Sequence, residues 1–368
     1  MTRVSEDAAD DVAATAVTSP GRLAVLTCAF ALGYAVAIVA GRQTVVPGTQ
    51  LALLAPGAGV AAVWFAFVRP WRWRAGSALL VLGVSAAAAA ATGLDTGEAL
   101  HRGVANAAQV LLFTWLLERG RGAASPLRFA ERLDVEKLVA LTGRAMLAAL
   151  LVAGFGPASF TDPGPDNALL VVAWVIRNAV TVVAFYPMAV LLRDRLARDG
   201  RDRTRPGSAP RWPLLGWLEL GALPIATGLT CWLVFGGEQL PVAFLLLATS
   251  AWVGARFTPL AANLHTILAG TAVALTTLDG RGPFAAVDDA VTEAAIVQAF
   301  LAVSLAVAMA LALERRANDG VTARLAEAGR QARGQSEMLA AVLAASEESV
   351  VVLDRAGRVR LRNRAAVR

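Results

Sequence analysis

The chain has 368 residues, of which 57% are hydrophobic, and its mean hydropathy is +0.57. This apolar share is above that of a typical soluble domain and argues against one. The formal net charge is +6, and nearly all of the positive charge comes from Arg, because Lys137 is the only Lys. Cys28 and Cys231 both lie in apolar runs, which argues against a disulfide framework and against a thiolate metal site.

The first 22 residues are polar and carry four acidic side chains, and we expect them to form a disordered cytoplasmic tail. Ten apolar runs follow. A membrane-spanning helix needs about 20 apolar residues, and the fourth and eighth runs are short, so the sequence predicts an all-α polytopic membrane protein of about ten, and at least eight, spans. The runs cover residues 23–40, 50–68, 73–92, 103–117, 138–156, 168–192, 214–235, 240–255, 259–278 and 294–313.

The basic residues fall mainly in alternate connections between these runs. If the even-numbered connections are cytoplasmic, they hold most of the Arg, including seven between Arg193 and Arg211. The other side then holds only Arg42, Arg102 and Arg281. This asymmetry predicts a multi-pass membrane protein with both termini in the cytoplasm. It also accounts for the basic charge without nucleic-acid binding.

The last apolar run ends at Glu314, and the polar segment after it keeps a helical pattern. Within it, seven positions recur at alternating intervals of four and three residues, which is the heptad pattern of a coiled coil. We call these positions the seam and expect them to face a second copy of the chain in a parallel homodimer. The seam consists of Val321, Leu325, Ala328, Ala332, Gln335, Leu339 and Val342. The segment Ser349–Asn363 then predicts a strand, a turn containing Gly357 and a second strand.

The order of motifs in the apolar region resembles the bacterial membrane-associated sensor domains, the first type of the MASE group. The resemblance covers about residues 23–316 and implies an integral membrane sensor. It is carried by LLAPGAGVAAVWF (53–65), RPWRWRAG (69–76), GVANAAQVLLFTWLLERG (103–120), AWVIRNAVTVVAFYPMAVLL (173–192), GARFTPLAA (254–262), GRGPF (280–284) and VQAFLAVSLAVAMALALERR (297–316).

Two positions depart from the pattern of that group. Its members often have Asn-x-x-Glu in the fourth run, where this chain has Asn106 and Gln109. They often have an acidic residue in the sixth run, where this chain has Arg177 and Asn178. Any role of those acids in relatives is therefore altered or absent here.

The C-terminal stretch LAASEESVVVLDRAGRVRLRNRAA (343–366) resembles the beginning of a PAS domain. A PAS fold needs about 100 residues, a usual domain size, and only its first two strands are present. The resemblance implies a truncated PAS domain, with an output module of the histidine kinase, diguanylate cyclase or phosphatase type expected beyond it. The predicted organisation is a tail over 1–22, a sensor domain over 23–313, a signalling helix over 314–345 and the PAS start over 346–368.

Five polar residues inside the predicted spans are the candidates for a ligand or switch site. Arg177 is near the centre of its run, where a charge costs at least about 2.5–3.5 kcal/mol, so an anionic ligand and a structural ion pair are equally good explanations. Hydrogen bonds between helices explain Asn178, Asn106 and Gln109 more simply than a ligand does. His265 is either a pH sensor or, by preference, a packed and hydrogen-bonded side chain.

The sequence shows no nucleophile–base pair, phosphate loop or zinc-ligand spacing, so we expect no cofactor, no metal and no enzymatic activity from this chain. The Pro56-Gly57 pair either unwinds the second span or allows close packing through Gly57 and Gly59. Two alternatives to a sensor of an unknown stimulus stay open. One is a polytopic small-molecule transporter, and the other is a truncated remnant that no longer signals.

Overall fold

The computed structural model describes residues 20–47, 49, 51–68, 70–119, 133–155, 165–202, 214–236, 242–345, 348–362 and 364–367. The contacts divide the chain into two units, Met1–Glu314 and Arg315–Arg368. Most of the predicted N-terminal tail lies outside the described residues. Pro20, Gly21 and Arg22 are helical, so the helix over the first apolar run includes three residues of the predicted tail.

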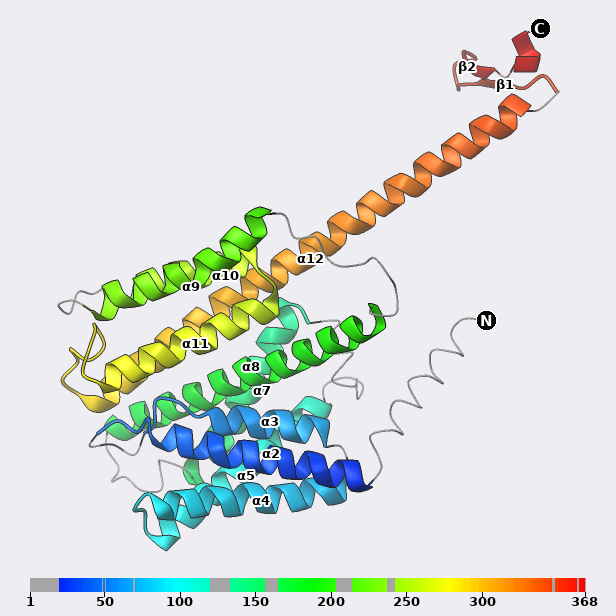
Figure 1. The fold of residues 1–368 in the computed structure, drawn as a ribbon. Coiled ribbons are helices and arrows are strands. Elements are labelled where there is room, and N and C mark those ends of the chain that lie inside the picture. The colour runs from blue at the N-terminus through cyan, green and yellow to red at the C-terminus, as the bar shows by residue number, and fades with distance from the viewer. Residues whose placement is uncertain are drawn as a thin grey trace. The chain divides into compact units, whose positions relative to one another are not determined.

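The described part of the chain contains ten α helices, and each of the ten apolar runs overlaps one of them (Figure 1). A single 3-10 turn, η1 (Ala153–Phe155), extends α7. The helices are α2 (Pro20–Arg42), α3 (Pro56–Phe67), α4 (Trp71–Ala91), α5 (Thr96–Arg119), α7 (Val135–Val152), α8 (Pro165–Asp202), α9 (Leu214–Phe235), α10 (Phe244–Arg256), α11 (Pro259–Leu278) and α12 (Ala290–Ala345).

Five of these helices are long and apolar enough to cross a membrane by length and composition. They contain the candidate spans Pro20–Arg42, Arg72–Ala91, Ala168–Leu196, Pro259–Leu278 and Ala290–Val342. Three more apolar helices are shorter, with 10 to 17 residues in their apolar stretch. The helical fold class is thus present, whereas the count of eight to ten spans stays a prediction.

The first unit has apolar side chains on its outside and polar side chains within. Val25, Leu79 and Ile225 are at least 70% exposed, whereas Asn178 and Asn263 are almost completely buried. This inverted distribution suits a hydrocarbon solvent, in which polar groups must find partners inside the protein. The 38-residue helix α8 packs against α3, α7 and α11, and its side chains belong to both large apolar clusters of the bundle.

The sequence predicts a single span over the apolar run 50–68, but the run is only partly helical. Its helical part, α3, has 12 residues and begins at Pro56, because proline lacks the backbone N–H and is favoured in the first turn of a helix. Before it, the described residues of the segment 43–55 (43–47, 49 and 51–55) are not helical, and Val45 and Ala52 form an isolated bridge. A Cβ on Gly57 would lie 2.5 Å from Cδ1 of Ile38, so this glycine allows α2 and α3 to pack closely.

Helix α12 has 56 residues, and the boundary between the two units falls within it. After it, β1 (Val351–Leu353) pairs antiparallel with β2 (Val359–Arg362), and the 3-10 helix η3 (Arg364–Val367) follows. Gly357 has φ +77°, which favours glycine in the turn, and Asp354 accepts hydrogen bonds there from backbone N–H groups. The predicted hairpin is confirmed, whereas the PAS domain stays a prediction.

Candidate functional site

A cavity of about 360 Å³ is lined by residues near the ends of α2 and α4 and in the first half of α5, α8 and α12. Its wall is mainly apolar and includes Ile38 on α2, Leu51 and Leu54 in the segment 43–55, and Trp174 on α8. Val291, in the first turn of α12, also lines it. One cavity therefore contacts both the non-helical segment and the helix that continues into the second unit.

The non-helical segment between α2 and α3 is buried in part, at Thr44, Val46 and 51–53. Leu51 and Leu53 are 1% and 0% exposed. Thr44 holds the segment against the end of α2, because its Oγ1 donates to the carbonyl of Gly41 at 2.7 Å and accepts from the N–H of Leu54 at 3.0 Å. Non-helical backbone is tolerated inside a membrane protein where it is buried in protein or lines a cavity, and this segment does both.

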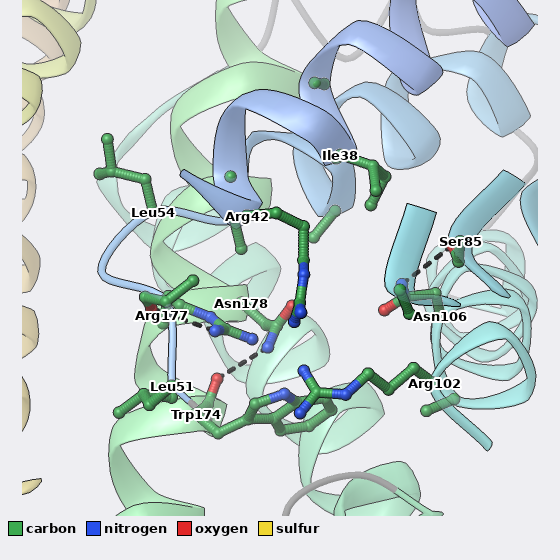
Figure 2. Close-up of a pocket in the computed structure, with 18 of the residues that line it drawn as sticks. Ile38, Arg42, Leu51, Leu54, Ser85, Arg102, Asn106, Trp174, Arg177 and Asn178 are labelled. Carbon is green, nitrogen blue, oxygen red and sulfur yellow. Dashed lines mark hydrogen bonds between the residues drawn. The ribbon is translucent and has the colours of Figure 1, made fainter. Parts of the chain in front are cut away.

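Three arginine side chains enter the cavity from three helices, Arg42 from α2, Arg102 from α5 and Arg177 from α8. Figure 2 shows their guanidinium groups turned toward the same space. Arg42 also donates from Nε to Oγ1 of Thr92, at 2.8 Å. The described residues that line the cavity include no Asp or Glu. The site is therefore rich in positive charge and in N–H donors.

Arg177 is 9% exposed and is the most deeply buried of the three arginines. Its Nη1 donates to the backbone carbonyl of Ala52 at 3.1 Å, and its guanidinium carbon lies 6.0 Å from the centre of the Trp174 ring. Among the described residues, its Nε has no hydrogen-bond partner and its guanidinium makes no ion pair. The predicted alternative of a structural ion pair thus finds no partner in the part of the chain that the structure describes.

Two of the predicted amides line the same cavity. Asn178 donates to the carbonyl of Trp174 at 2.8 Å, and Asn106 donates to Oγ of Ser85 at 3.0 Å. Ser85 also shares a hydrogen bond of 2.6 Å with the hydroxyl of Tyr34. This network joins α2, α4 and α5 beside the cavity, and the sequence analysis had singled out only Asn106 from it.

The other two candidates lie elsewhere. Gln109 is 4% exposed and borders, with Tyr34 and Asn106, a small void of about 10 Å³, large enough for about one water molecule. His265 on α11 is 7% exposed, and its Nε2 has no partner among the described residues. It does not line the cavity. The structure thus brings together Arg177, Asn178 and Asn106, with Gln109 next to them, and leaves His265 apart.

The family model MASE1 matches residues 25–317 of the chain. The chain belongs to the MASE1 family. MASE1 is a family of membrane sensor domains, so the resemblance read from the sequence motifs is confirmed for this region. No curated protein and no solved structure matches the chain. The MASE1 region contains the whole cavity and ends inside α12.

The MASE1 region holds a second buried arginine whose environment differs from that of Arg177. Arg74, in the first turn of α4, is 8% exposed. It donates from Nε to the carbonyl of Val68 at 2.8 Å and from Nη2 to that of Phe65 at 3.2 Å, at the C-terminal end of α3. Its Nη2 also forms an ion pair of 2.7 Å with Glu118 on α5. Arg74 therefore has protein acceptors for both Nε and Nη2, one of them a carboxylate.

Three further residues of the MASE1 domain were missed. Arg42 and Arg102 were assigned to external connections, because both stand at the edge of an apolar run. Gln298 on α12 is 1% exposed and donates from Nε2 to the carbonyl of Leu53 at 2.6 Å. Its position as a lone amide inside the last apolar run was the feature of the sequence that could have identified Gln298. No three His, Cys, Asp or Glu side chains of the described residues are grouped as a metal site requires.

Beyond the MASE1 domain, the seam lies on the part of α12 that belongs to the second unit. All of its members are exposed in the single chain. Val321, Leu325, Leu339 and Val342 are between 53% and 68% exposed. Arg324 and Arg330, which the heptad pattern places toward solvent, are also exposed.

Proposed function

We propose that this MASE1 domain is the sensory input module of a bacterial signal-transduction protein, placed in the inner membrane with both termini in the cytoplasm. The module senses an unknown stimulus within the bundle and passes the signal along α12. The receiving partner is a PAS domain followed by an output module of the histidine kinase, diguanylate cyclase or phosphatase type. The chain itself performs no catalysis in this proposal.

The observation that carries the proposal is the continuity of α12. Its first part packs in the bundle core, where Leu305, Met309 and Leu313 are at most 3% exposed. The same helix runs on without interruption to Ala345. A rotation or shift of α12 that begins in the bundle therefore has an unbroken helix along which to reach the second unit.

We further propose that the seam pairs with the same seam of a second copy in a parallel homodimer. Four exposed apolar side chains in the single chain support this arrangement, since pairing would remove them from water. The seam is weak, because Ala328, Ala332 and Gln335 are poor core residues. A marginal coiled coil suits a switch, because a small free-energy difference is enough to shift it between two states.

Four variants, each with one cysteine introduced on α12, test the dimer. Single cysteines that replace Leu325 and Leu339 in separate variants, in a chain whose native Cys28 and Cys231 are replaced by Ala, should cross-link between copies in native membranes. The matched controls are Arg324→Cys and Arg330→Cys, on the same helix but off the seam, and they should cross-link much less. Equal cross-linking at all four positions would contradict the proposed seam.

An insertion experiment tests signalling itself, in a version of the chain fused to a working output module. One extra residue after Gln335 rotates everything that follows by about 100°, because a helix has 3.6 residues per turn. This insertion should lock or abolish the output. Seven extra residues nearly restore the phase and should largely preserve it. A transporter, which the arginine-lined cavity also suits, is indifferent to both insertions, so an unchanged output would favour the transporter.

A further inference from the structure

Among the described residues, the guanidinium of Arg177 lacks a full set of hydrogen-bond acceptors. One carbonyl, that of Ala52, and one aromatic ring contact the guanidinium, and its Nε has no partner. A buried cation without a counter-charge is unfavourable in a medium of low polarity. The cavity beside Arg177 is where a missing partner would be placed.

The charge of the cavity identifies what such a partner must be. The charges of Arg42 and Arg102 both act on Arg177 and repel it. Glu98 lies one turn before Arg102 on α5 and offsets part of the charge there, so the inference rests on Arg177. The planar guanidinium offers several N–H donors in a fixed geometry that matches the paired oxygens of a carboxylate or a phosphate. An oxyanion would therefore satisfy Arg177 and relieve the repulsion among the three cations.

The size and the wall of the cavity limit the ligand further. A volume of about 360 Å³ is at the low end of the range for small-molecule sites. Ile38, Leu54 and Trp174 supply apolar surface around the arginines. This combination suits a small molecule with one or two acid groups on a short body.

The cavity is also connected to the helix that leaves the bundle. Arg177 donates to the carbonyl of Ala52, and Gln298 of α12 donates to the carbonyl of the next residue, Leu53. The two side chains thus hold adjacent peptide groups of the same buried segment. Val291, one residue after the start of α12, lines the cavity directly. A ligand that draws on the donors of Arg177 would therefore act on a segment that α12 also holds.

We propose that this cavity binds a small oxyanion, a carboxylate or a phosphate, through Arg177, and that the segment Thr44–Ala55 passes the effect of binding to α12 through Gln298. Arg177 is a binding residue, and Gln298 is a positioning residue that does not contact the ligand. The coupling to α12 rests on the proposed sensory function, whereas the binding does not.

Binding is tested on the full chain in nanodiscs of zwitterionic lipid, with the thermal unfolding midpoint as the measurement. The probes are inorganic phosphate, acetate and succinate, each compared with chloride at the same ionic strength. At least one probe should raise the midpoint beyond chloride in a saturable manner, and Arg177→Leu should weaken the apparent affinity at least tenfold. The matched control is Arg144→Leu, which removes a half-buried arginine of α7 outside the cavity and should respond as the unmodified chain does.

A second set of nanodiscs separates a soluble ligand from a lipid headgroup. These nanodiscs contain phosphatidylglycerol and receive no added oxyanion. A rise in the midpoint that depends on Arg177 here assigns the site to a lipid phosphate, whereas a rise only with the soluble probes assigns it to a free small anion. If neither lipid nor probe raises the midpoint beyond chloride, or if Arg177→Leu responds equally, the cavity is not an oxyanion site.

Coupling is tested by hydrogen exchange on the same samples with the probe that binds. The bound oxyanion should slow exchange in both the segment 44–55 and the first half of α12. In Gln298→Leu, the affinity for the oxyanion should stay within about threefold of the unmodified chain. The bound oxyanion should still slow hydrogen exchange in 44–55 but should no longer slow it in α12. Unchanged protection of α12 in this variant would overturn the proposed route. Because no output module is involved, failure here leaves the sensory proposal standing, and failure of the insertion experiment leaves the binding result intact.

Discussion

Arg74 and Arg177 are two almost equally buried arginines in one bundle, and the protein surrounds them differently. Arg74 has two backbone carbonyls and the carboxylate of Glu118 within hydrogen-bond distance. Arg177 has one carbonyl and an aromatic ring, and it faces a cavity that two more arginines enter. Helix α4 contacts both regions, since Arg74 lies in its first turn and Ser85 lines the cavity.

The difference shows what a purely structural arginine looks like in this fold. The end of α3 supplies hydrogen-bond acceptors for Arg74, because the last carbonyls of a helix lack partners within the helix and attract a cation. The cavity gives Arg177 no comparable set of acceptors. The bundle thus satisfies a buried charge at one site and leaves another open, and the open one lies beside space for a ligand.

The largest expected effect is the difference in stability between two variants, each of which lacks one of the two arginines. Arg74→Leu leaves two carbonyls and Glu118 without their partner and should destabilise the domain by about 2–4 kcal/mol. The estimate stays below that for a fully buried ion pair, because the side chain of Glu118 is 43% exposed and regains water. Arg177→Leu should change stability by less than about 1 kcal/mol, since the lost hydrogen bond is offset by the removal of an unpaired charge.

Unfolding midpoints in identical nanodiscs, without added oxyanion, measure both variants. A larger loss for Arg177→Leu than for Arg74→Leu would reverse the comparison and would mean that Arg177 has a structural role after all.

A smaller effect is expected from giving Arg177 a built-in partner. Asn106 faces the cavity from α5 (Figure 2), so Asn106→Asp places a carboxylate among the arginines. This variant should be more stable to unfolding by about 1 kcal/mol at neutral pH. Its unfolding midpoint should no longer respond to added oxyanions. The gain should disappear on acidification, because the protonated carboxyl carries no charge.

The matched control for this variant is Gln109→Glu, which adds the same charge one turn further along α5 and outside the cavity. It should destabilise the domain and keep the response to oxyanions. The measurement is the unfolding midpoint with and without phosphate, at neutral and acidic pH. A similar gain in both variants would show that position relative to the arginines is unimportant.

A third effect, of about the same size as the second, concerns the neutral polar groups of the same region. Tyr34→Phe removes the hydrogen bond to Ser85 and should cost about 1 kcal/mol, less than the loss of Arg74. Its affinity for oxyanions should stay within about threefold of the unmodified chain, because no charge is changed. A tenfold loss of affinity would mean that the hydroxyl network, and not only the arginines, defines the site.

Much of the architecture was predictable, because apolar runs and basic connections are strong local patterns. Each of the ten runs overlaps a helix, and the MASE1 motifs identified the family. The hairpin was readable from its alternation and from Gly357. The second run misled, because a buried non-helical segment is as apolar as a helix, and hydropathy does not distinguish the two.

The cavity was only partly predictable. Arg177 stood out, since a charge in the middle of an apolar run is unusual. Arg42 and Arg102 stand at the edges of runs, where arginines normally face water, and only the three-dimensional packing directs them inward. The contact between Gln298 and Leu53 joins residues 245 positions apart, and no local pattern contains that information.

The shortness of α3 has an electrical consequence. Its 12 residues measure about 18 Å, against about 30 Å for the hydrocarbon core, and the helix begins beside the cavity. In the proposed topology the cavity is therefore recessed from the outer surface, and an anion that reaches it from outside crosses part of the transmembrane voltage. A full crossing is worth about 2.3 kcal/mol per charge at 100 mV, and the inside-negative potential of a cell opposes entry of an anion. Occupancy of the cavity would then depend on the membrane potential as well as on ligand concentration, and an energised cell would need more ligand than a depolarised one.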